Sequence, residues 1–381
     1  MRRASLVFGL LRVAQSLSVR GGVGARRPFA ARAAASGSGE PHRVVFLGSP
    51  GVAALTLEAL LGAARDGRGG GFEVVACVSQ PPARRGRKKV LRKSAAHEVA
   101  DAAGIPCLTP GSARDPAFLE ALRALEPDLC VTAAYGQFLP EAFLAIPRMG
   151  TYNIHPSRLP RWRGAAPVQR ALEAGDATIG VAVLETVKAM DAGPIAARSP
   201  PRAVADGDAA PALLDELFGV GAALLIDDVL PAVWDGRLRA EPQDDALAVA
   251  APKLAKADAL LDLRAPPPGG RRDAATAARD KVRAFDPWPG TTLPLRVGAA
   301  AVESVKVLSA RVGATAAAAG ATEIALAEAK DALIVPCGDG STLEVLRLQA
   351  PNRKPTDAAA YFNGLRGETC AYAPECSRYE L

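Results

Sequence analysis

The chain contains short runs of apolar residues, and each run is followed by a stretch in which apolar residues recur at helical spacing. Val44–Leu47 is wholly apolar, and residues 52–64 continue it with apolar positions three and four apart. Strands that are apolar on both faces are typical of parallel sheets covered by helices on both sides. Further strands are expected at Glu73–Val78, Ile105–Leu108 and Leu129–Ala133, and further helices at Ala95–Ala103 and Pro116–Leu125. The alternation predicts an α/β domain with a Rossmann-like, doubly wound, mostly parallel sheet.

The second half of the chain has a different pattern. A long helix with apolar periodicity is expected from Asp206 to Val233, and a polar connector follows it. Beyond the connector, alternating runs bounded by Gly, Asp and Asn predict the strands of a small C-terminal β-barrel, OB-like in kind, at 301–308, 332–336 and 342–348. We therefore expect a first domain at 42–236, a linker at 237–251 and the barrel domain at 252–381.

The composition excludes several classes of protein. The 381 residues are 49% hydrophobic, yet no stretch approaches the roughly 20 uninterrupted apolar residues of a membrane-spanning helix. Only three histidines, and six cysteines without a C-x-x-C pair, argue against a metal centre. The turn after the first strand is G-S-P-G rather than G-x-G-x-x-G, and no G-x-x-x-x-G-K-[ST] loop occurs. Dinucleotide binding and ATP or GTP hydrolysis therefore have no support.

The net charge of +6 comes from the amino terminus. Residues 1–39 carry seven arginines, no lysine and no acidic residue, which leaves 39 basic against 40 acidic residues in the rest of the chain. The body of the protein is therefore not a generally basic nucleic-acid binder. An Arg-rich, acid-free extension with several serines has the composition of an organelle transit peptide, and its arginine content favours the mitochondrion over the chloroplast. A disordered native tail is the alternative.

Candidate chemistry is concentrated at 151–170. Tyr152 and Ile154 alternate with Asn153 and His155, so on a strand the amide and the imidazole share one face. At the end of a central strand they would point into the ligand cleft of an open α/β sheet. A lone histidine is often only structural, and an aspartate such as Asp191, in M-D-A-G-P, usually only caps a turn. A histidine in a cleft nevertheless needs a carboxylate to orient it, which makes Asp191 its candidate partner.

These segments resemble those of the folate-dependent formyltransferases, and within that family the branch that acts on methionyl-tRNA. The shared motifs are N-x-H at Asn153 and His155, S-R-L-P at 157–160, R-W-R-G-A-A-P at 161–167, A-Y-G-Q-F-L-P at 134–140, M-D-A-G at 190–193 and V-R-A-F-D-P-W-P-G at 282–290. The resemblance runs from about Arg43 to about Asn363. It implies the formyltransferase fold, a catalytic first domain and a tRNA-associated barrel domain.

The resemblance also implies an activity. The formyl donor would be 10-formyltetrahydrofolate and the acceptor the α-amino group of methionyl initiator tRNA, with Asn153, His155 and Asp191 as the catalytic residues and no metal. The N-x-H…D set is shared with other folate-dependent formyltransferases and with 10-formyltetrahydrofolate hydrolases, so an enzyme acting on a small molecule remains the alternative. A non-enzymatic RNA-binding protein that keeps the fold is a third possibility.

Substrate contacts are implied in the same way. Folate is expected along two loops, whose residues are Tyr135, Gly136, Ser157, Arg158, Leu159 and Pro160. The family usually has glycine and leucine where this chain has Pro156 and Arg158, so Arg158 either contacts the acidic folate tail or faces water.

The acceptor end of tRNA is expected at the basic run of residues 84–93, which carries seven positive charges and no acid. Its candidate tRNA-binding residues are Arg84, Arg85, Arg87, Lys88 and Lys89, and a solvated surface loop is the alternative. Trp288 is expected to pack in the core rather than stack on a base. We expect a monomer without membrane contact.

Overall fold

The computed structural model describes residues 39–85, 89–267, 272–318 and 320–374. They form two compact units. Unit 1 holds the described residues of Met1–Arg163, Gly180–Pro201 and Leu214–Ala250, and unit 2 those of Gly164–Ile179, Arg202–Leu213 and Ala251–Leu381. The expected transit peptide lies outside the described residues except for Gly39, and so do Arg87 and Lys88 of the basic run.

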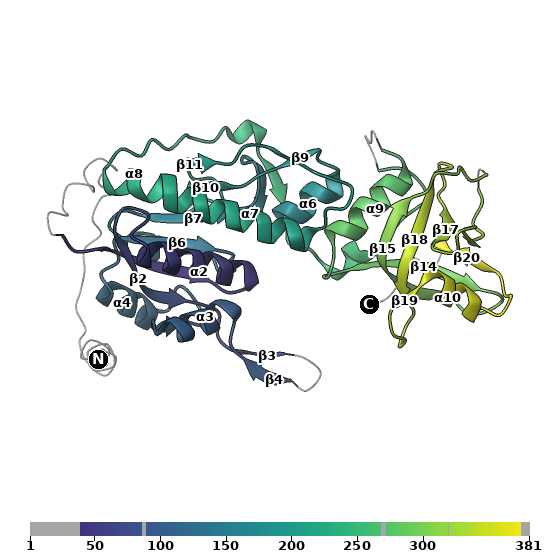
Figure 1. Ribbon diagram of the computed structural model, residues 1–381, viewed down its shortest axis with the longest axis horizontal. Coiled ribbons are helices and arrows are strands. Elements are labelled where there is room, and N and C mark those ends of the chain that lie inside the picture. Colours follow the sequence, from purple (N-terminus) through teal and green to yellow (C-terminus); the bar gives the residue numbers. More distant parts are fainter. Residues whose placement is uncertain (1–38, 86–88, 268–271, 319, 375–381) are drawn as a thin grey trace. The chain divides into compact units, whose positions relative to one another are not determined.

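Unit 1 is built on a seven-stranded sheet in the order β11-β10-β7-β6-β1-β2-β5 (Figure 1). The five strands from β5 to β7 are parallel, and β10 and β11 add an antiparallel edge. In chain order these strands are β1 (His42–Gly48), β2 (Phe72–Val78), β5 (Cys107–Leu108), β6 (Leu129–Ala133), β7 (Thr151–His155), β10 (Ala182–Glu185) and β11 (Ile195–Arg198). The expected Rossmann-like, mostly parallel sheet is confirmed.

Helices follow the parallel strands, as the sequence pattern predicts. They are α2 (Gly51–Arg65), α3 (Ala95–Ala103), α4 (Pro116–Ala124) and the short α5 (Glu141–Leu144). Val45 and Leu47 of β1 share one apolar cluster with Phe118 of α4. On β1, Gly48 allows a close approach of α2, because a Cβ there would lie 2.6 Å from the Ala53 side chain. A hairpin of β3 (Ala83–Arg85) and β4 (Val90–Arg92) stands where the sequence predicts only a loop.

The expected long helix is one continuous run, Ala210–Trp234. It consists of α7 (Ala210–Leu224), a π-helical turn (Leu225–Val229) and α8 (Leu230–Trp234). By length and composition it is the one helix among the described residues that could cross a membrane, but 56% of its most apolar window is buried inside the protein. Gly221 lies against Ile154, where a Cβ would come within 2.4 Å of the Ile154 side chain. The run therefore packs on the sheet as a core helix, and its hydropathy says nothing about a membrane.

Unit 2 contains an antiparallel sheet in the order β16-β17-β18-β15-β14-β20, with β19 paired to β18. Its strands are β14 (Thr291–Val297), β15 (Glu303–Val312), β16 (Ala325–Leu326), β17 (Leu333–Pro336), β18 (Thr342–Gln349), β19 (Thr356–Asp357) and β20 (Cys370–Tyr372). A bridge between Glu323 and Ala371 joins the two ends of the sheet, so the expected C-terminal barrel is confirmed. The helix α9 (Ala274–Ala284) buries an alanine-rich face against it, and α10 (Ala358–Gly364) packs against it with Ala358, Tyr361 and Phe362.

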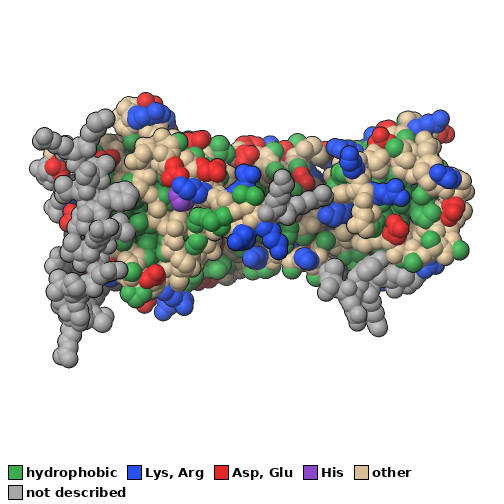
Figure 2. All heavy atoms as spheres, turned by 90° about the horizontal axis from the view of Figure 1, so that it is seen from below, with side chains coloured by type: hydrophobic (Ala, Val, Ile, Leu, Met, Phe, Trp, Pro, Cys, Tyr) green, Lys and Arg blue, Asp and Glu red, His purple; other side chains and the backbone are tan. Residues whose placement is uncertain are grey.

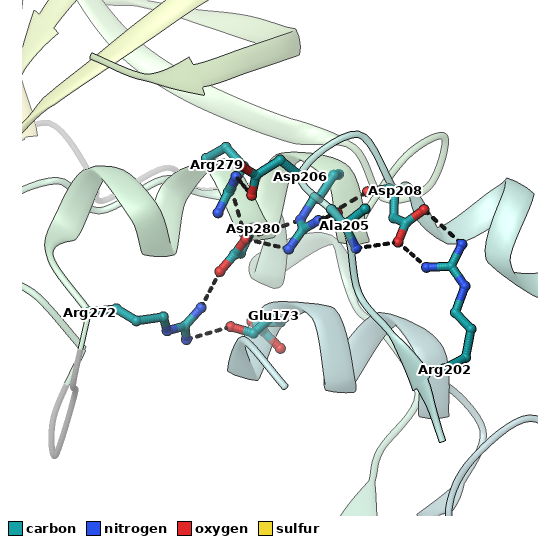
Figure 3. A network of polar contacts seen from close by, with 9 residues as sticks. Glu173, Arg202, Ala205, Asp206, Asp208, Arg272, Arg279 and Asp280 are labelled. Atoms are coloured by element: carbon teal, nitrogen blue, oxygen red, sulfur yellow. Dashed lines mark hydrogen bonds and ion pairs between the residues drawn. The ribbon is translucent and has the colours of Figure 1, made fainter. Parts of the chain in front are cut away.

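Unit 2 also includes segments from earlier in the chain, namely α6 (Pro167–Ala174), β9 (Thr178–Ile179) and β12 (Arg202–Ala203). Figure 3 shows how they are tied to α9 through Asp280, whose side chain is only 2% exposed and pairs with three arginines. Arg272 bridges from Asp280 to the Glu173 carbonyl at 2.9 Å, and Arg279 reaches Asp206 at 2.8 Å. A single buried carboxylate thus connects three separate stretches of chain.

Trp288 corrects an expectation. Its side chain is 50% exposed, so the assignment to the core is wrong. Phe285, three residues earlier and directly after α9, is completely buried. The D-P-W-P-G turn then carries Trp288 out to the surface.

Candidate active site

The three candidate catalytic side chains lie together at the carboxyl end of β7. Asn153 and His155 share one face of the strand, and Asp191 approaches from the loop between β10 and β11. The Asn153 amide nitrogen lies 3.5 Å from Asp191 Oδ1, and His155 Nδ1 lies 3.7 Å from Asp191 Oδ2. The period-two interpretation of the Asn153 and His155 pattern is therefore correct, and residue 191 comes within reach of both.

The imidazole of His155 is held between two groups. Its Nε2 lies 2.9 Å from the Trp162 carbonyl oxygen, which can only accept, so Nε2 carries a proton and donates it. Proton exchange is then left to Nδ1, the nitrogen that faces Asp191. The His155 side chain is 5% exposed and the Asp191 side chain 16% exposed, so the carboxylate lies nearer to the opening of the site.

Thr132 is a member of this site that the sequence did not single out. It is the only polar side chain of β6, LCVTA, and its hydroxyl donates to Asn153 Oδ1 at 2.8 Å. This hydrogen bond fixes the orientation of the Asn153 amide, because an amide oxygen accepts and an amide nitrogen donates. The donating nitrogen of Asn153 is thereby turned away from the sheet and toward Asp191.

Two backbone positions beside His155 adopt left-handed conformations. Asp191 has φ of 50° and Trp162 has φ of 71°. Such conformations cost an ordinary residue about 1–3 kcal/mol and are found where surrounding contacts impose them, often at functional sites. Trp162 belongs to β8 (Arg161–Gly164), which pairs with β13 (Val249–Ala251).

The candidate folate residues lie in two turns near this cluster in the chain. The Tyr135 and Gly136 turn follows β6, and the Gln80 side-chain amide donates to the Tyr135 carbonyl at 3.2 Å. The Tyr135 side chain itself is buried in the core beside α4, and burial raises the pKa of its phenol well above the ordinary value. Its neutral ring is part of the fold, so only the backbone of this turn is available to a ligand.

The second turn is similar. The side chains of Ser157 and Leu159 are buried, Pro160 is half-buried, and the Ser157 hydroxyl donates to the Arg161 carbonyl at 2.9 Å. Arg158 is exposed, with its stem against Gly180. Folate binding by the residues of the two turns stays a prediction.

The described residues of the basic run lie on the β3–β4 hairpin, except Lys93, which follows β4 and pairs with Asp101. Arg84 and Lys89 are exposed, and Arg84 donates to the Lys89 carbonyl at 3.4 Å. Arg85 is the last residue of β3. Figure 2 shows Lys and Arg side chains gathered around the hairpin, where it comes toward the viewer.

A surface cavity of about 570 Å³ lies at the opposite end of β1, lined by His42, Arg43, Asp128 and Arg148 among others. It contains none of the candidate site residues. The buried Asp128 carboxylate there is satisfied by the Arg148 side chain and the Arg43 backbone, so a structural role accounts for it. Among the residues that the structure describes, no three His, Cys, Asp or Glu side chains are grouped to hold a metal ion.

Comparison with known proteins adds the decisive observation. The family described as formyl transferase matches residues 42–227, and the formyl transferase C-terminal domain matches residues 272–366. A methionyl-tRNA formyltransferase of Pseudomonas paraeruginosa is 40% identical over 329 residues, which are 86% of this chain and 98% of that protein. The chain belongs to the methionyl-tRNA formyltransferase family.

A second member of that family, from Phenylobacterium zucineum, is 38% identical over 84% of this chain and 96% of its own length. Solved structures agree on the fold. An N-formyltransferase from Helicobacter canadensis, in complex with folinic acid and dTDP-3-aminofucose, has a TM-score of 0.57 at 13% identity, over 81% of this chain and 100% of that one. HypX from Aquifex aeolicus has a TM-score of 0.53 at 17% identity, over 86% of this chain and 50% of that one.

Proposed function

We propose that this protein transfers the formyl group of 10-formyltetrahydrofolate to the α-amino group of methionyl initiator tRNA. We propose further that it does so in an organelle, and that this organelle is the mitochondrion rather than the chloroplast. Membership of the methionyl-tRNA formyltransferase family supports the reaction. The observation that carries it in this chain is the convergence of Asn153, His155 and Asp191 at the end of a central strand. The acid-free, arginine-rich residues 1–39 support the organelle.

The residues suit attack by an amine on a formyl carbon. Folate supplies the formyl group, whose oxygen gains negative charge as the amine attacks. Asn153 Nδ2, oriented by Thr132, is a preorganised donor for that oxygen. The amine must also lose a proton, and His155 Nδ1 and the Asp191 carboxylate are the two groups placed to take it. The bond between the formyl carbon and the folate nitrogen then breaks, and return of that proton to the departing nitrogen releases tetrahydrofolate. The Trp162 carbonyl keeps the imidazole in one orientation while this happens.

The surroundings fit a folate and a tRNA end. The Tyr135–Gly136 and Ser157–Pro160 turns offer backbone donors and acceptors, because their own side chains, apart from Arg158, are largely buried. The β3–β4 hairpin offers exposed cations for tRNA phosphates. We propose that the enzyme works as a monomer, without metal and without membrane contact.

The test uses protein that lacks residues 1–39, with formyl-folate as donor. Charged initiator tRNA and glycinamide ribonucleotide are offered as competing acceptors, and the formylated product is identified. Formylation of methionyl-tRNA is expected. Formylation of only the small amine, or release of free formate, would instead assign the chain to another branch of the folate enzymes.

Two variants test the site directly. His155→Ala and Asn153→Ala are each expected to lower turnover by at least about 10²–10³-fold, because each removes a group that acts on the reacting atoms. Their thermal unfolding is expected to stay close to that of the unaltered chain. Turnover near the unaltered level in either variant would remove that residue from the catalytic set.

Fusion of residues 1–39 to a reporter tests the organelle, and delivery to chloroplasts or retention in the cytosol would contradict the mitochondrial proposal.

A further inference from the structure

The carboxylate of Asp191 lies on a loop whose backbone adopts an unfavourable conformation. The loop between β10 and β11 has no regular secondary structure around Asp191, and residue 191 is in the left-handed region. Gly193, two residues on, passes so close to the end of β10 that a Cβ would lie 1.7 Å from the Glu185 carbonyl oxygen. A loop with a strained residue and a close approach needs outside contacts to keep one conformation.

Gln243 supplies such contacts from a segment 52 residues further along the chain. Its side-chain nitrogen donates to the Asp191 carbonyl at 2.8 Å and to the Gly193 carbonyl at 2.7 Å. Both protons of the amide are thus directed to the loop on either side of residue 192. The contact between the two segments extends further along the backbone. Glu241, two residues before Gln243, forms a β-bridge with Ile195, two residues after Gly193.

The other end of the Gln243 amide reaches the opposite side of His155. Its oxygen accepts from Arg163 Nε at 3.0 Å, and Arg163 also pairs with Asp245 at 2.8 Å. Arg163 directly follows Trp162, whose carbonyl binds His155 Nε2. One side chain therefore connects the segment that faces Nδ1 of the imidazole with the segment that faces Nε2.

We propose that Gln243 is a positioning residue for formyl transfer, which keeps the Asp191 carboxylate in register with His155 and Asn153. This inference rests on the proposed function. Gln243 does not touch the three candidate catalytic side chains; it acts through the Asp191 and Gly193 carbonyls. The geometry also fixes the chemistry that position 243 requires, namely two donors toward the loop and one acceptor toward Arg163.

Two substitutions separate this role from a purely structural one. Gln243→Met removes donors and acceptor at nearly constant volume. Gln243→Glu removes only the donors, and its carboxylate, kept ionised by Arg163, would form an ion pair there but repel the two loop carbonyls. If Gln243 only anchors Arg163, the glutamate variant works; if it positions the loop, the glutamate variant fails.

The assay is steady-state formylation of methionyl-tRNA by the full folded chain. We expect kcat to fall about 10- to 100-fold in both variants, the effect of a displacement of about 1 Å at the reacting groups. KM for each substrate should change less than about threefold, because binding and reaction use different contacts. The matched control is Gln349→Met, which removes a glutamine of unit 2 whose side chain donates to the nearby Arg353 carbonyl at 2.7 Å.

Hydrogen exchange gives a second readout that does not depend on activity. Backbone amides of residues 189–195 should exchange faster in both variants, while those of β1 and β6 keep their protection. Near-normal kcat in Gln243→Glu would overturn the proposal, and so would a loss of kcat in both variants that only follows a lower unfolding temperature. If the unaltered enzyme does not formylate methionyl-tRNA, the proposed function fails, while the exchange measurement still decides whether Gln243 holds the loop.

Discussion

At the scale of single residues, orientation matters as much as identity in this site. Thr132 donates to the Asn153 amide oxygen and thereby decides which way the amide points. Thr132→Val keeps the shape of the side chain and removes its hydroxyl, so the Asn153 amide can flip and exchange the positions of its oxygen and nitrogen. We expect kcat to fall about 5- to 10-fold, the equivalent of one hydrogen bond of about 1 kcal/mol.

The control for this substitution is Thr56→Val, since Thr56 is also buried and its hydroxyl donates to the Val52 carbonyl of its own helix α2. Unfolding temperatures of the two valine variants should be similar. Equal kcat values in the two variants, measured with saturating substrates, would show that Thr132 does not orient the amide.

Sequence can predict some of these residues and not others, for a physical reason. Asn153 and His155 are two apart on a strand, so the period of two places them together without knowledge of the fold. Asp191 can be predicted as a site residue only from the family resemblance, since its local sequence indicates only a turn residue. Thr132 and Gln243 act through contacts 21 and 52 residues distant in the chain, and nothing in their own neighbourhood marks them.

At the scale of elements, the β3–β4 hairpin carries a prediction about charge. Arg84 and Lys89 are exposed and lie near each other, with no carboxylate in the basic run to neutralise them. Replacing both by glutamine should raise KM for methionyl-tRNA and leave KM for formyl-folate nearly unchanged. The dependence of log KM on log salt should also become shallower, by about 0.7–0.9 for each tRNA phosphate that the hairpin no longer neutralises.

Arg65→Gln is the matched control, because Arg65 is exposed at the carboxyl end of α2, and that end of the helix lies on the side of the sheet away from the strand ends that carry the site. It should change neither KM nor the salt dependence. A hairpin variant that behaves like this control would make the basic run an ordinary solvated surface.

An ion pair in the segment that precedes α7 is expected to make the stability of the fold depend on pH. The Arg202 side chain, helped by the Ala205 backbone N–H, holds the pKa of Asp208 below its ordinary value of 3.8 (Figure 3). A carboxyl group with a lowered pKa stabilises the fold above its unfolded pKa and loses that contribution as pH falls through the folded one. The unfolding temperature of the unaltered chain should therefore drop more between about pH 6 and about pH 2.5 than that of Asp208→Asn. Equal drops would mean that this pair does not contribute to stability.

Elements with a strong local pattern are predictable from the sequence, and edge elements are not. Residues 129–133 and 95–103 match β6 and α3 in full, because an apolar run and a helical period depend only on neighbours. The antiparallel strands β10 and β11 escape prediction, since four residues each carry too little pattern. The residue type of Trp288 favours the core, yet the residue is 50% exposed.

At the scale of the molecule, Asp280 connects distant parts of unit 2 (Figure 3). Asp280→Ala would leave Arg272 and Arg283 without their carboxylate partner, and Arg279 with only the exposed Asp206. Removing one partner of a buried ion pair costs about 3–5 kcal/mol, and we expect a loss of that size in the free energy of unfolding. Asp206→Ala, which removes an exposed partner of Arg279, should cost less than about 1 kcal/mol. Equal losses in the two variants, measured by denaturant unfolding, would contradict the central role of Asp280.

The two compact units do not follow the two family matches. The formyl transferase match covers 42–227, yet α6 and residues 202–213 belong to unit 2. The polar partners of α6 lie beyond residue 250: Arg170 pairs with Asp258 at 2.9 Å, and the Glu173 carbonyl accepts from Arg272. A fragment of residues 42–236 keeps the whole parallel sheet but leaves these partners behind.

We therefore expect residues 164–179 to lose hydrogen-exchange protection in the fragment 42–236, while β1 and β6 keep theirs. Formyl transfer should be lost as well, because the fragment also lacks Gln243, which holds the Asp191 loop, and β13, which pairs with the strand of Trp162. Addition of separate residues 252–381 should restore part of the protection, since these residues bind the folded form of α6. If the fragment alone protects 164–179 as the full chain does, then α6 folds without residues 252–381, and its dependence on those residues is contradicted.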